Sequence, residues 1–304
     1  MQFLSLLGHI DSVYATRFFP SGTVIISGGA DFRLKIWSAE TGNCAATLVG
    51  HRGAINAISV VERGRNILSG GNDGAVKLWD VGRSATLHSF EDLALGAIND
   101  ISLGVADRRS GGESSADQNE REVGTEGKFM IVAGEGAGSF GLSVGHGDVG
   151  GGKVAGVVLK SREKFFELPT PSAVNTCLAI DDRTFAYGLQ DGTFAVADVR
   201  NMKSSLHVEK ESRGAILNIQ PFRSGGFLVS TQDGSVFYVP NKVSASASSS
   251  GGTSGETVME LTGPESDPVY KIATQGNNVV FTASRDGMVR KFLIDEEIVA
   301  NVES

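Results

Sequence analysis

Residues 50–80, GHRGAINAISVVERGRNILSGGNDGAVKLWD, decide the fold. Three short apolar segments, at 54–61, 66–69 and 75–79, fill this stretch, and an Asp-Gly pair at 73–74 separates the last two. Short segments rich in β-branched residues, joined by turns of Gly, Asn and Asp, are typical of strands and hairpins. The stretch therefore predicts a small sheet that begins after Gly-His and ends at Trp-Asp.

A copy of this stretch precedes it, from Gly8 to Trp37. In both copies a His lies 22 residues before an Asp, and that Asp lies 6 residues before a Trp. The two sets are His9, Asp31 and Trp37, and His51, Asp73 and Trp79. A Gly-His…Trp-Asp unit of this length resembles the WD40 repeat, which implies one blade of a β-propeller.

Four weaker copies follow. The third begins at 97–101 and resumes at 129–144, with Ala137 at the Asp position and Ser143 at the Trp position. The last three copies keep an Asp-Gly turn, at 191–192, 233–234 and 286–287, and place Ala197 and Phe292 at Trp positions of the fourth and sixth copies. The sequence therefore predicts an all-β WD40 propeller with six recognisable repeats.

Stacked blades cover one another's faces, so we expect residues 1–304 to form a single propeller domain. Two polar insertions, at about 107–128 and 241–257, bury too little apolar surface to offset their ordering entropy, and we expect them to be mobile surface loops. Closure of such a ring usually comes from the N-terminal strand. We therefore expect residues 3–7 to pair with the C-terminal strands that end near Ile294.

Composition narrows the class of partner. The net charge is −8 and the pI about 5.2, which argues against nucleic acid or an anionic membrane as a partner. Cys44 and Cys177 form no CxxC motif, and a reducing compartment, cytoplasm or nucleus, is the simpler interpretation. The N-terminus lacks the basic segment of a secretory signal, and no apolar run reaches membrane-spanning length.

The Ser, His and Asp residues of the first two repeats allow two interpretations. They could form a nucleophilic triad, or a buried hydrogen-bond chain that ties strands to turns, as the WD40 resemblance implies. Duplication favours the structural chain, because identical triads in adjacent blades make no catalytic sense. The residues are His9, Ser27, Asp31 and Trp37, and His51, Ser69, Asp73 and Trp79. We predict no catalytic site and no enzyme.

Other motifs are weaker. Residues 147–154, GDVGGGKV, nearly match a phosphate loop, but Val154 replaces the hydroxyl residue and the segment that follows is strand-like. A glycine-rich hairpin is favoured, and nucleotide binding stays an alternative. The five histidines show no metal-ligand spacing with the cysteines, so no metal or other cofactor is predicted. Phenylalanines at strand positions are expected in the core: Phe18, Phe19, Phe185, Phe194, Phe227 and Phe292.

Off-consensus segments resemble a narrower family. They are RGRN at 63–66, REVGTE at 121–126 and DPVYK at 267–271, together with RFFPSG at 17–22, LKIWSAE at 34–40, LWDVGRSA at 78–85, ELTG at 260–263 and RDGMVR at 285–290. The chain resembles the proteasomal ATPase-associated factor family, whose members carry an N-terminal domain and a further blade of a seven-bladed propeller ahead of the position matching Met1. The resemblance implies a chaperone of proteasome regulatory-particle assembly that binds the C-terminal domain of a proteasomal ATPase subunit. We expect a monomer outside its complexes.

The WD40 resemblance also implies a partner-binding face, because residues after Gly-His and around the Asp turn lie on one face of such folds. In this chain these are Asp11, Ser12, Arg52, Asn72, Glu135, Gln190, Gln232, Asp267, Tyr270 and Arg285. We expect the acidic members to pair with a basic ATPase surface. The alternative is a substrate receptor of a cullin ubiquitin ligase, since Ala197-Asp198-Val199-Arg200 is a broken WDxR box, or another generic scaffold.

Overall fold

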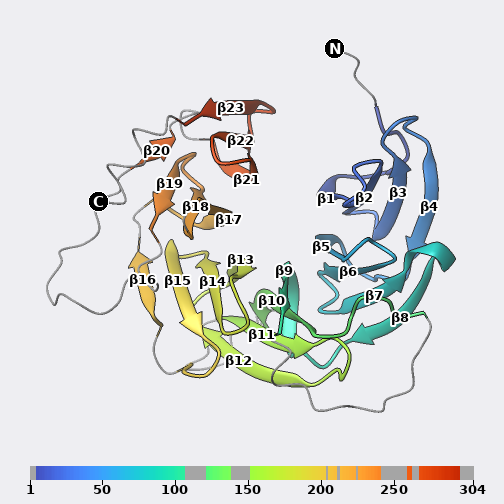
Figure 1. Cartoon of the computed structure of the whole chain (residues 1–304), viewed down its shortest axis with the longest axis horizontal. Coiled ribbons are helices and arrows are strands. Elements are labelled where there is room, and N and C mark those ends of the chain that lie inside the picture. Colours follow the sequence, from blue (N-terminus) through green and yellow to red (C-terminus); the bar gives the residue numbers. More distant parts are fainter. Residues whose placement is uncertain are drawn as a thin grey trace, which may run out of the picture. The chain divides into compact units, whose positions relative to one another are not determined.

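The computed structural model describes residues 5–106, 121–137, 151–202, 205–210, 213–223, 225–240, 259–261 and 267–294. These residues form six antiparallel sheets, each a meander of consecutive strands, and we call each sheet a blade (Figure 1). The chain divides into two compact units, Met1–Ala173 and Val174–Ser304, with three blades in each. The prediction of an all-β propeller with six repeats is confirmed, because each of the six predicted repeats forms one blade.

The first unit holds three four-stranded blades. Blade 1 comprises β1 (Val13–Phe18), β2 (Val24–Gly29), β3 (Arg33–Ser38) and β4 (Cys44–Val49). Blade 2 comprises β5 (Ile55–Val61), β6 (Asn66–Gly71), β7 (Val76–Asp80), the short 3-10 helix η1 (Val81–Arg83) and β8 (Ala85–Phe90). Blade 3 comprises β9 (Leu95–Val105), β10 (Lys128–Gly136), β11 (Gly152–Val158) and β12 (Lys164–Thr170).

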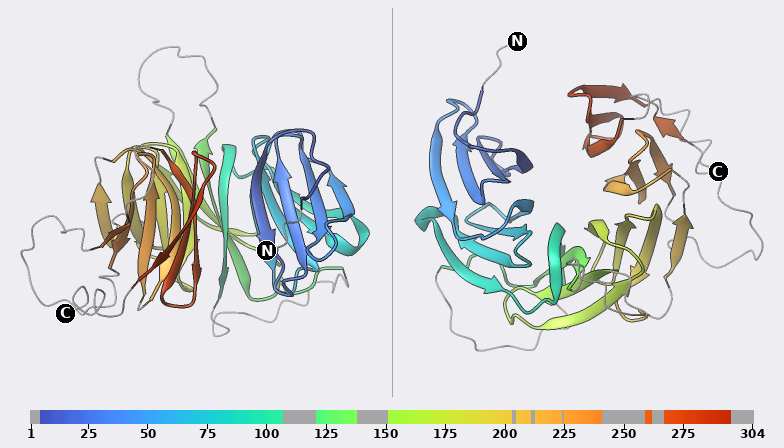
Figure 2. Two further views of the ribbon diagram at one scale, coloured as in Figure 1. Left: turned by 90° about the horizontal axis from the view of Figure 1, so that it is seen from above. Right: turned by 180° about the vertical axis from the view of Figure 1, so that it is seen from behind.

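The second unit holds blades 4 to 6 (Figure 2). Blade 4 comprises β13 (Val174–Ala179), β14 (Thr184–Leu189), β15 (Thr193–Asp198) and β16 (His207–Lys210). Blade 5 comprises β17 (Ile216–Phe222), β18 (Gly226–Thr231), β19 (Val236–Val239) and β20 (Glu260–Leu261). Blade 6 has three strands among the described residues: β21 (Val269–Gln275), β22 (Val279–Ser284) and β23 (Val289–Leu293).

The two faces of blade 2 pack against different neighbours, because successive residues of a strand point to opposite faces. Ile58 and Ile67 lie in one apolar cluster with Ile26 and Leu34 of blade 1. The other face contributes Val76, Leu78 and Leu68 to a cluster with blade 3, whose members there are Leu95, Ile98, Ile101, Met130, Val132, Val157 and Leu159. This two-sided burial is what holds neighbouring blades together within the unit.

The third repeat needs a correction. Its third strand is β11, and Val157 lies opposite Met130 as Trp79 lies opposite Ile67. The Trp position therefore belongs to Val157 and not to Ser143. The reason is that extra residues separate β10 from β11, so that counting along the sequence no longer reproduces the register. In the fourth and sixth repeats the prediction is confirmed, because Ala197 pairs with Phe185 and Phe292 with Val280.

The strand that carries the large buried aromatic side chain differs between blades. In blade 2, Trp79 on the third strand is fully buried beside Ile67. In blade 4, the small Ala197 stands at that place and Phe185, its partner on the second strand, is fully buried. Phe227 likewise lies opposite Val239 in blade 5. Phe18 contradicts the expectation that strand phenylalanines lie in the core, because it is 62% exposed.

Several expectations concern residues that the structure does not describe. The 241–257 insertion lies outside the described residues, as do 107–120 of the first insertion and 147–150 of the glycine-rich motif. Of the expected closing segment 3–7, Phe3 and Leu4 lie outside them too, and Ser5–Leu7 belong to no strand. No helix in the described part of the chain is both long and apolar enough to cross a membrane.

Candidate interaction face

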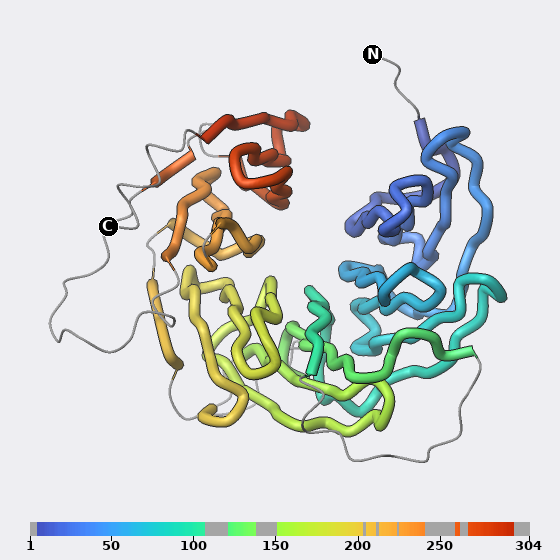
Figure 3. Tube along the Cα trace, viewed as in Figure 1, coloured from blue at the N-terminus to red at the C-terminus, as the bar shows by residue number. Residues whose placement is uncertain are grey.

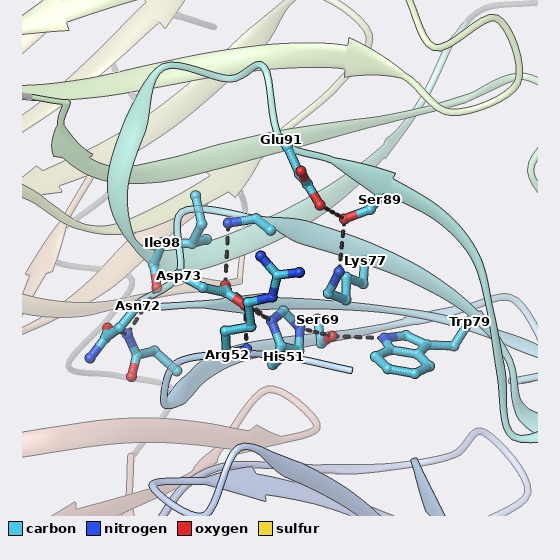
Figure 4. Close-up of polar contacts among 12 residues, drawn as sticks. His51, Arg52, Ser69, Asn72, Asp73, Lys77, Trp79, Ser89, Glu91 and Ile98 are labelled. Atoms are coloured by element: carbon cyan, nitrogen blue, oxygen red, sulfur yellow. Dashed lines mark hydrogen bonds and ion pairs between the residues drawn. The ribbon is translucent and has the colours of Figure 1, made fainter. Parts of the chain in front are cut away.

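Blades 1 and 2 each contain a chain of four hydrogen-bonded side chains. In blade 2, Trp79 Nε1 donates to Ser69 Oγ at 2.8 Å, and Ser69 Oγ lies 2.7 Å from His51 Nε2 (Figure 4). His51 Nδ1 lies 2.9 Å from Asp73 Oδ2. In blade 1 the same contacts measure 2.8, 2.7 and 2.8 Å. Their atoms belong to Trp37, Ser27, His9 and Asp31.

The direction of each chain follows from the donors available. The Asp carboxylate can only accept, so the His donates from Nδ1, and in the neutral imidazole Nε2 is then the acceptor. The Ser hydroxyl must then donate to Nε2 while accepting from the Trp indole. Ser27 and Ser69 are 4% and 0% exposed. These two serines therefore have the partners of a catalytic triad but present no oxygen to a substrate, which favours the structural interpretation.

The carboxylate at the end of the chain also binds the loop backbone. Asp73 accepts hydrogen bonds from the backbone amides of Arg52 at 2.8 Å and Ala75 at 3.3 Å. Burial by itself would raise the pKa of Asp73, but the hydrogen bonds from His51 and these amides outweigh burial and lower the pKa to about 2. The pKa of Asp31 is lowered by the same balance. Each blade's Gly-His loop is thus fixed to its Asp turn.

Blades 5 and 6 hold the turn carboxylate without a His. In blade 5, Thr231 Oγ1 donates to Asp233 Oδ1 at 2.6 Å, and in blade 6 Ser284 Oγ donates to Asp286 Oδ1 at 2.6 Å. The hydroxyl residue lies two positions before the Asp, where blade 2 has Gly71. A Cβ at Gly71 would lie 3.0 Å from Asp73 Oδ1 and 3.1 Å from His51 Nδ1. In blade 2 a hydroxyl side chain at this position would therefore crowd His51, Asp73 and the Ala54 carbonyl oxygen.

The structure places the predicted face residues at the Asp-turn ends of their blades, where the second and third strands meet. In the first unit, Asp11, Ser12, Arg52 and Asn72 are exposed and Glu135 is half-buried. In the second unit the exposed members are Gln190, Gln232, Tyr270 and Arg285, and Asp267 is half-buried. The Asp-turn carboxylates themselves are occupied by internal hydrogen bonds. The charge that each unit offers to a partner at this end therefore comes from the flanking loop residues.

The comparisons with known proteins agree with this geometry. The family model described as "WD domain, G-beta repeat" matches residues 2–38 and 42–80, which are the two repeats with the complete side-chain chain. Proteasomal ATPase-associated factor 1 of Gallus gallus is 36% identical over 200 residues, or 66% of this chain and 44% of that protein. The Homo sapiens protein of the same name is 36% identical over 201 residues, with the same two shares.

A fungal relative extends the match. The 26S proteasome regulatory subunit RPN14 of Saccharomyces cerevisiae is 30% identical over 234 residues, or 73% of this chain and 52% of that protein. The chain is a WD40-repeat protein related to proteasomal ATPase-associated factor 1. It spans about half the length of the curated relatives that it matches.

Asparagines that the sequence analysis did not single out link neighbouring blades of this WD40 protein. The first strand of every blade has a bulge, and its extra residue is Asn in blades 2, 3 and 4. Asn56 Nδ2 donates to the carbonyl of Ile98 at 3.0 Å, and Asn175 Nδ2 donates to Ile216 at 2.9 Å. The tetrapeptide Gly-Ala-Ile-Asn, present at both 53–56 and 96–99, is the sequence signal that could have revealed them.

The REVGTE segment of this WD40 protein, residues 121–126, contacts blades 2 and 3. Asn66, fully buried in blade 2, accepts from Val123 N at 2.6 Å and donates to the carbonyl oxygens of Arg121 at 3.2 Å and Trp79 at 2.9 Å. Glu122 forms ion pairs with Arg162 and, at 4.0 Å, with Lys160. Residues 121–126 thus join blade 2, at the start of β6, to blade 3.

The weaker motifs of this WD40 protein also have places in the structure. Lys153 and Val154 lie on strand β11, with Lys153 Nζ 3.2 Å from Glu167 and 3.1 Å from the Leu93 carbonyl. A phosphate loop requires a helix at this point. Arg200 Nε and Nη2 donate to the two carboxylate oxygens of Asp198 at 3.1 and 2.6 Å. No group of three or more His, Cys, Asp or Glu side chains within the described ranges could hold a metal ion.

Proposed function

We propose that this WD40 protein is a non-enzymatic protein-binding propeller that assists assembly of the proteasome regulatory particle. In this proposal it binds the C-terminal domain of a proteasomal ATPase subunit. The observation that carries the proposal is the 36% identity to proteins named proteasomal ATPase-associated factor 1, joined by the 30% identity to a yeast 26S proteasome regulatory subunit.

The binding surface that we propose is, in each unit, the Asp-turn end of its blades. Its loops are held in place by internal hydrogen bonds, such as that from Arg52 N to Asp73, so little ordering entropy is lost when a partner binds. Asp11 supplies negative charge at this end of the first unit and Asp267 at this end of the second, and the whole chain carries −8. A basic surface on the ATPase would be attracted by these charges, which mainly raise the association rate and select the partner. The bound propeller would block that ATPase surface until assembly displaces it.

The remaining features that we propose are those expected of a WD40 protein that binds other proteins. We propose one propeller domain, a monomer outside its complexes, and a location in the cytoplasm, the nucleus or both. The proposal includes no cofactor, nucleic acid or membrane as a partner. The ubiquitin-ligase alternative has no structural observation in its favour, since the Arg200 guanidinium is bound to Asp198 in its own turn.

A pull-down with purified regulatory-particle ATPase subunits tests the proposal. We expect the wild-type chain to retain one subunit, and the double variant Asp11→Lys with Asp267→Lys to bind it at least ten-fold more weakly because the charge attraction is reversed. The matched control is Glu40→Lys with Asp182→Lys, which changes the net charge by the same amount. These two residues lie in turns of blades 1 and 4 at the end opposite the Asp turns. If no subunit is retained, the proposed partner is wrong. If both double variants bind like wild type, the acidic surface is wrong.

A further inference from the structure

One Asp turn departs from the other described turns. The residue that follows the turn Asp has a left-handed backbone, with φ of +74° at Gly74, +87° at Gly192, +95° at Gly234 and +78° at Gly287. In blade 1 this residue is Phe32, with φ of +63°. The left-handed region is unfavourable for any residue with a Cβ, and a bulky side chain there is a genuine outlier. Phe32 is therefore a costly choice where glycine serves the other turns.

Local packing does not account for Phe32. Its side chain is 44% exposed, and it belongs to none of the buried apolar clusters of the first unit. The turn itself is ordinary, since Phe32 N donates to the Gly29 carbonyl at 3.1 Å and Asp31 binds His9 as in blade 2. A strained backbone with an exposed aromatic side chain is the pattern found where a residue is retained for contact with another molecule.

The surroundings of Phe32 show what kind of contact it suits. Ile10, the residue after the Gly-His pair of blade 1, is 82% exposed, and its backbone amide lies 3.4 Å from Asp31 Oδ2, next to Phe32 in the chain. Arg33 follows Phe32 and is exposed, and Val49, paired with Arg33 across β3 and β4, is 66% exposed. Ile10, Phe32 and Val49 are thus three exposed apolar residues that the turn and the strand pairing of blade 1 bring near Arg33, and we call them the blade 1 apolar ridge.

Blade 2 shows that the ridge is not a general property of the fold. At the position of Phe32 it has Gly74, where a Cβ would lie only 2.7 Å from the Leu95 carbonyl oxygen of blade 3. At the position of Val49 it has Glu91, which is exposed and charged, because Leu48 pairs with Leu34 as Phe90 pairs with Val76. Blade 2 therefore has no apolar side chain of the ridge at the positions of Phe32 and Val49.

We infer that the blade 1 apolar ridge is the energetic centre of the partner-binding face, with Phe32 inserted into an apolar pocket of the bound ATPase subunit. Arg33, the next residue in the chain, is exposed, so the pocket that fits has an acidic group at its border. This inference rests on the proposed function for the identity of the partner. Exposed aromatic side chains that become buried dominate the affinity of protein interfaces, whereas surrounding charges contribute less.

The test separates binding from stability. Phe32→Gly removes the ring and the backbone strain together, so we expect its Tm to equal or exceed that of wild type while its Kd for the ATPase subunit retained in the pull-down rises at least ten-fold. Ser84→Gly is the matched control. Ser84 is exposed and also left-handed, with φ of +52°, but it lies at the opposite end of blade 2, and we expect its Kd to be unchanged.

Each outcome is decisive. The inference is overturned if wild type binds and Phe32→Gly binds within three-fold of it, or if Phe32→Gly lowers the Tm by more than about 4 °C, which would make Phe32 a structural residue. Arg33→Glu tests the acidic border, and we expect weaker binding with a slower association rate. If wild type binds no ATPase subunit, the proposed function fails first, and the two failures are thereby distinguished.

Discussion

At the scale of single residues, the Asp73 carboxylate accepts hydrogen bonds from three donors: the His51 ring and the backbone amides of Arg52 and Ala75. Asp73→Ala leaves the buried His51 and both amides without this acceptor. We expect the free energy of unfolding to fall by about 1–3 kcal/mol, measured by urea denaturation. Asp11→Ala, at an exposed position, is the control and should change it by less than about 0.5 kcal/mol. An equal effect of both variants would show that the network does not stabilise the fold.

The lowered pKa of Asp73 predicts a pH dependence. A carboxyl whose pKa is about 2 in the folded state, below its ordinary value, stabilises the fold above the ordinary value and loses that contribution as the pH falls through the folded-state pKa. Asp73→Asn keeps an oxygen acceptor but has no charge. We expect the stability difference between wild type and Asp73→Asn to be largest above about pH 4 and to shrink toward pH 2. A difference that stayed constant over this range would contradict the assignment.

At the scale of elements, Asn66, the first residue of β6, connects blade 2 to residues 121–123. Asn66→Ala removes three hydrogen bonds of a fully buried side chain, and we expect a loss of about 2–4 kcal/mol. Hydrogen exchange at the Val123 amide should accelerate, because its acceptor is gone. Asn43→Ala, in the exposed turn between β3 and β4, is the matched control. Unchanged exchange at Val123 would show that the segment is held by other contacts, such as the Glu122 ion pairs.

Blade architecture was predictable from sequence where spacing is regular. His51, Asp73 and Trp79 recur at the spacing of His9, Asp31 and Trp37, and a register follows directly from such a copy. The third blade was predicted incorrectly beyond β10, because its long connection to β11 breaks the count on which the assignment of Ser143 depended. The exposure of Phe18 could not be predicted, because apolar character does not reveal whether another blade covers that face.

The candidate site was less predictable than the fold. The positions of the face residues follow from the repeat. Phe32 stands out only through its positive φ, because in the sequence Asp-Phe in place of Asp-Gly is one difference among many in degenerate repeats. The bond from Asn56 to the next blade likewise depends on the bulge, which no spacing rule locates. Sequence identifies which residue types stand at the turns. Their exposure and partners depend on neighbouring blades.

At the scale of the whole molecule, the chain divides into units Met1–Ala173 and Val174–Ser304, while our domain proposal is one propeller. A single domain unfolds in one cooperative transition. We expect calorimetry to show one transition that both Asp73→Ala, in the first unit, and Asp233→Ala, in the second, move to lower temperature. Two transitions, each moved by only one of these variants, would show that the units fold independently.

The two ways of holding the turn carboxylate have a consequence for how such repeats can diverge. A Cβ at Gly71 would crowd the Ala54 carbonyl oxygen, Asp73 and His51, whereas blades 5 and 6, which lack the His, carry Thr231 and Ser284 at that place. A repeat that loses its His first leaves the carboxylate short of a donor, and one that gains the hydroxyl first is overcrowded. Either single step is therefore penalised although the double change is accommodated. Substitutions at these two positions, 20 residues apart in the chain, should be epistatic, and in related repeats they should covary.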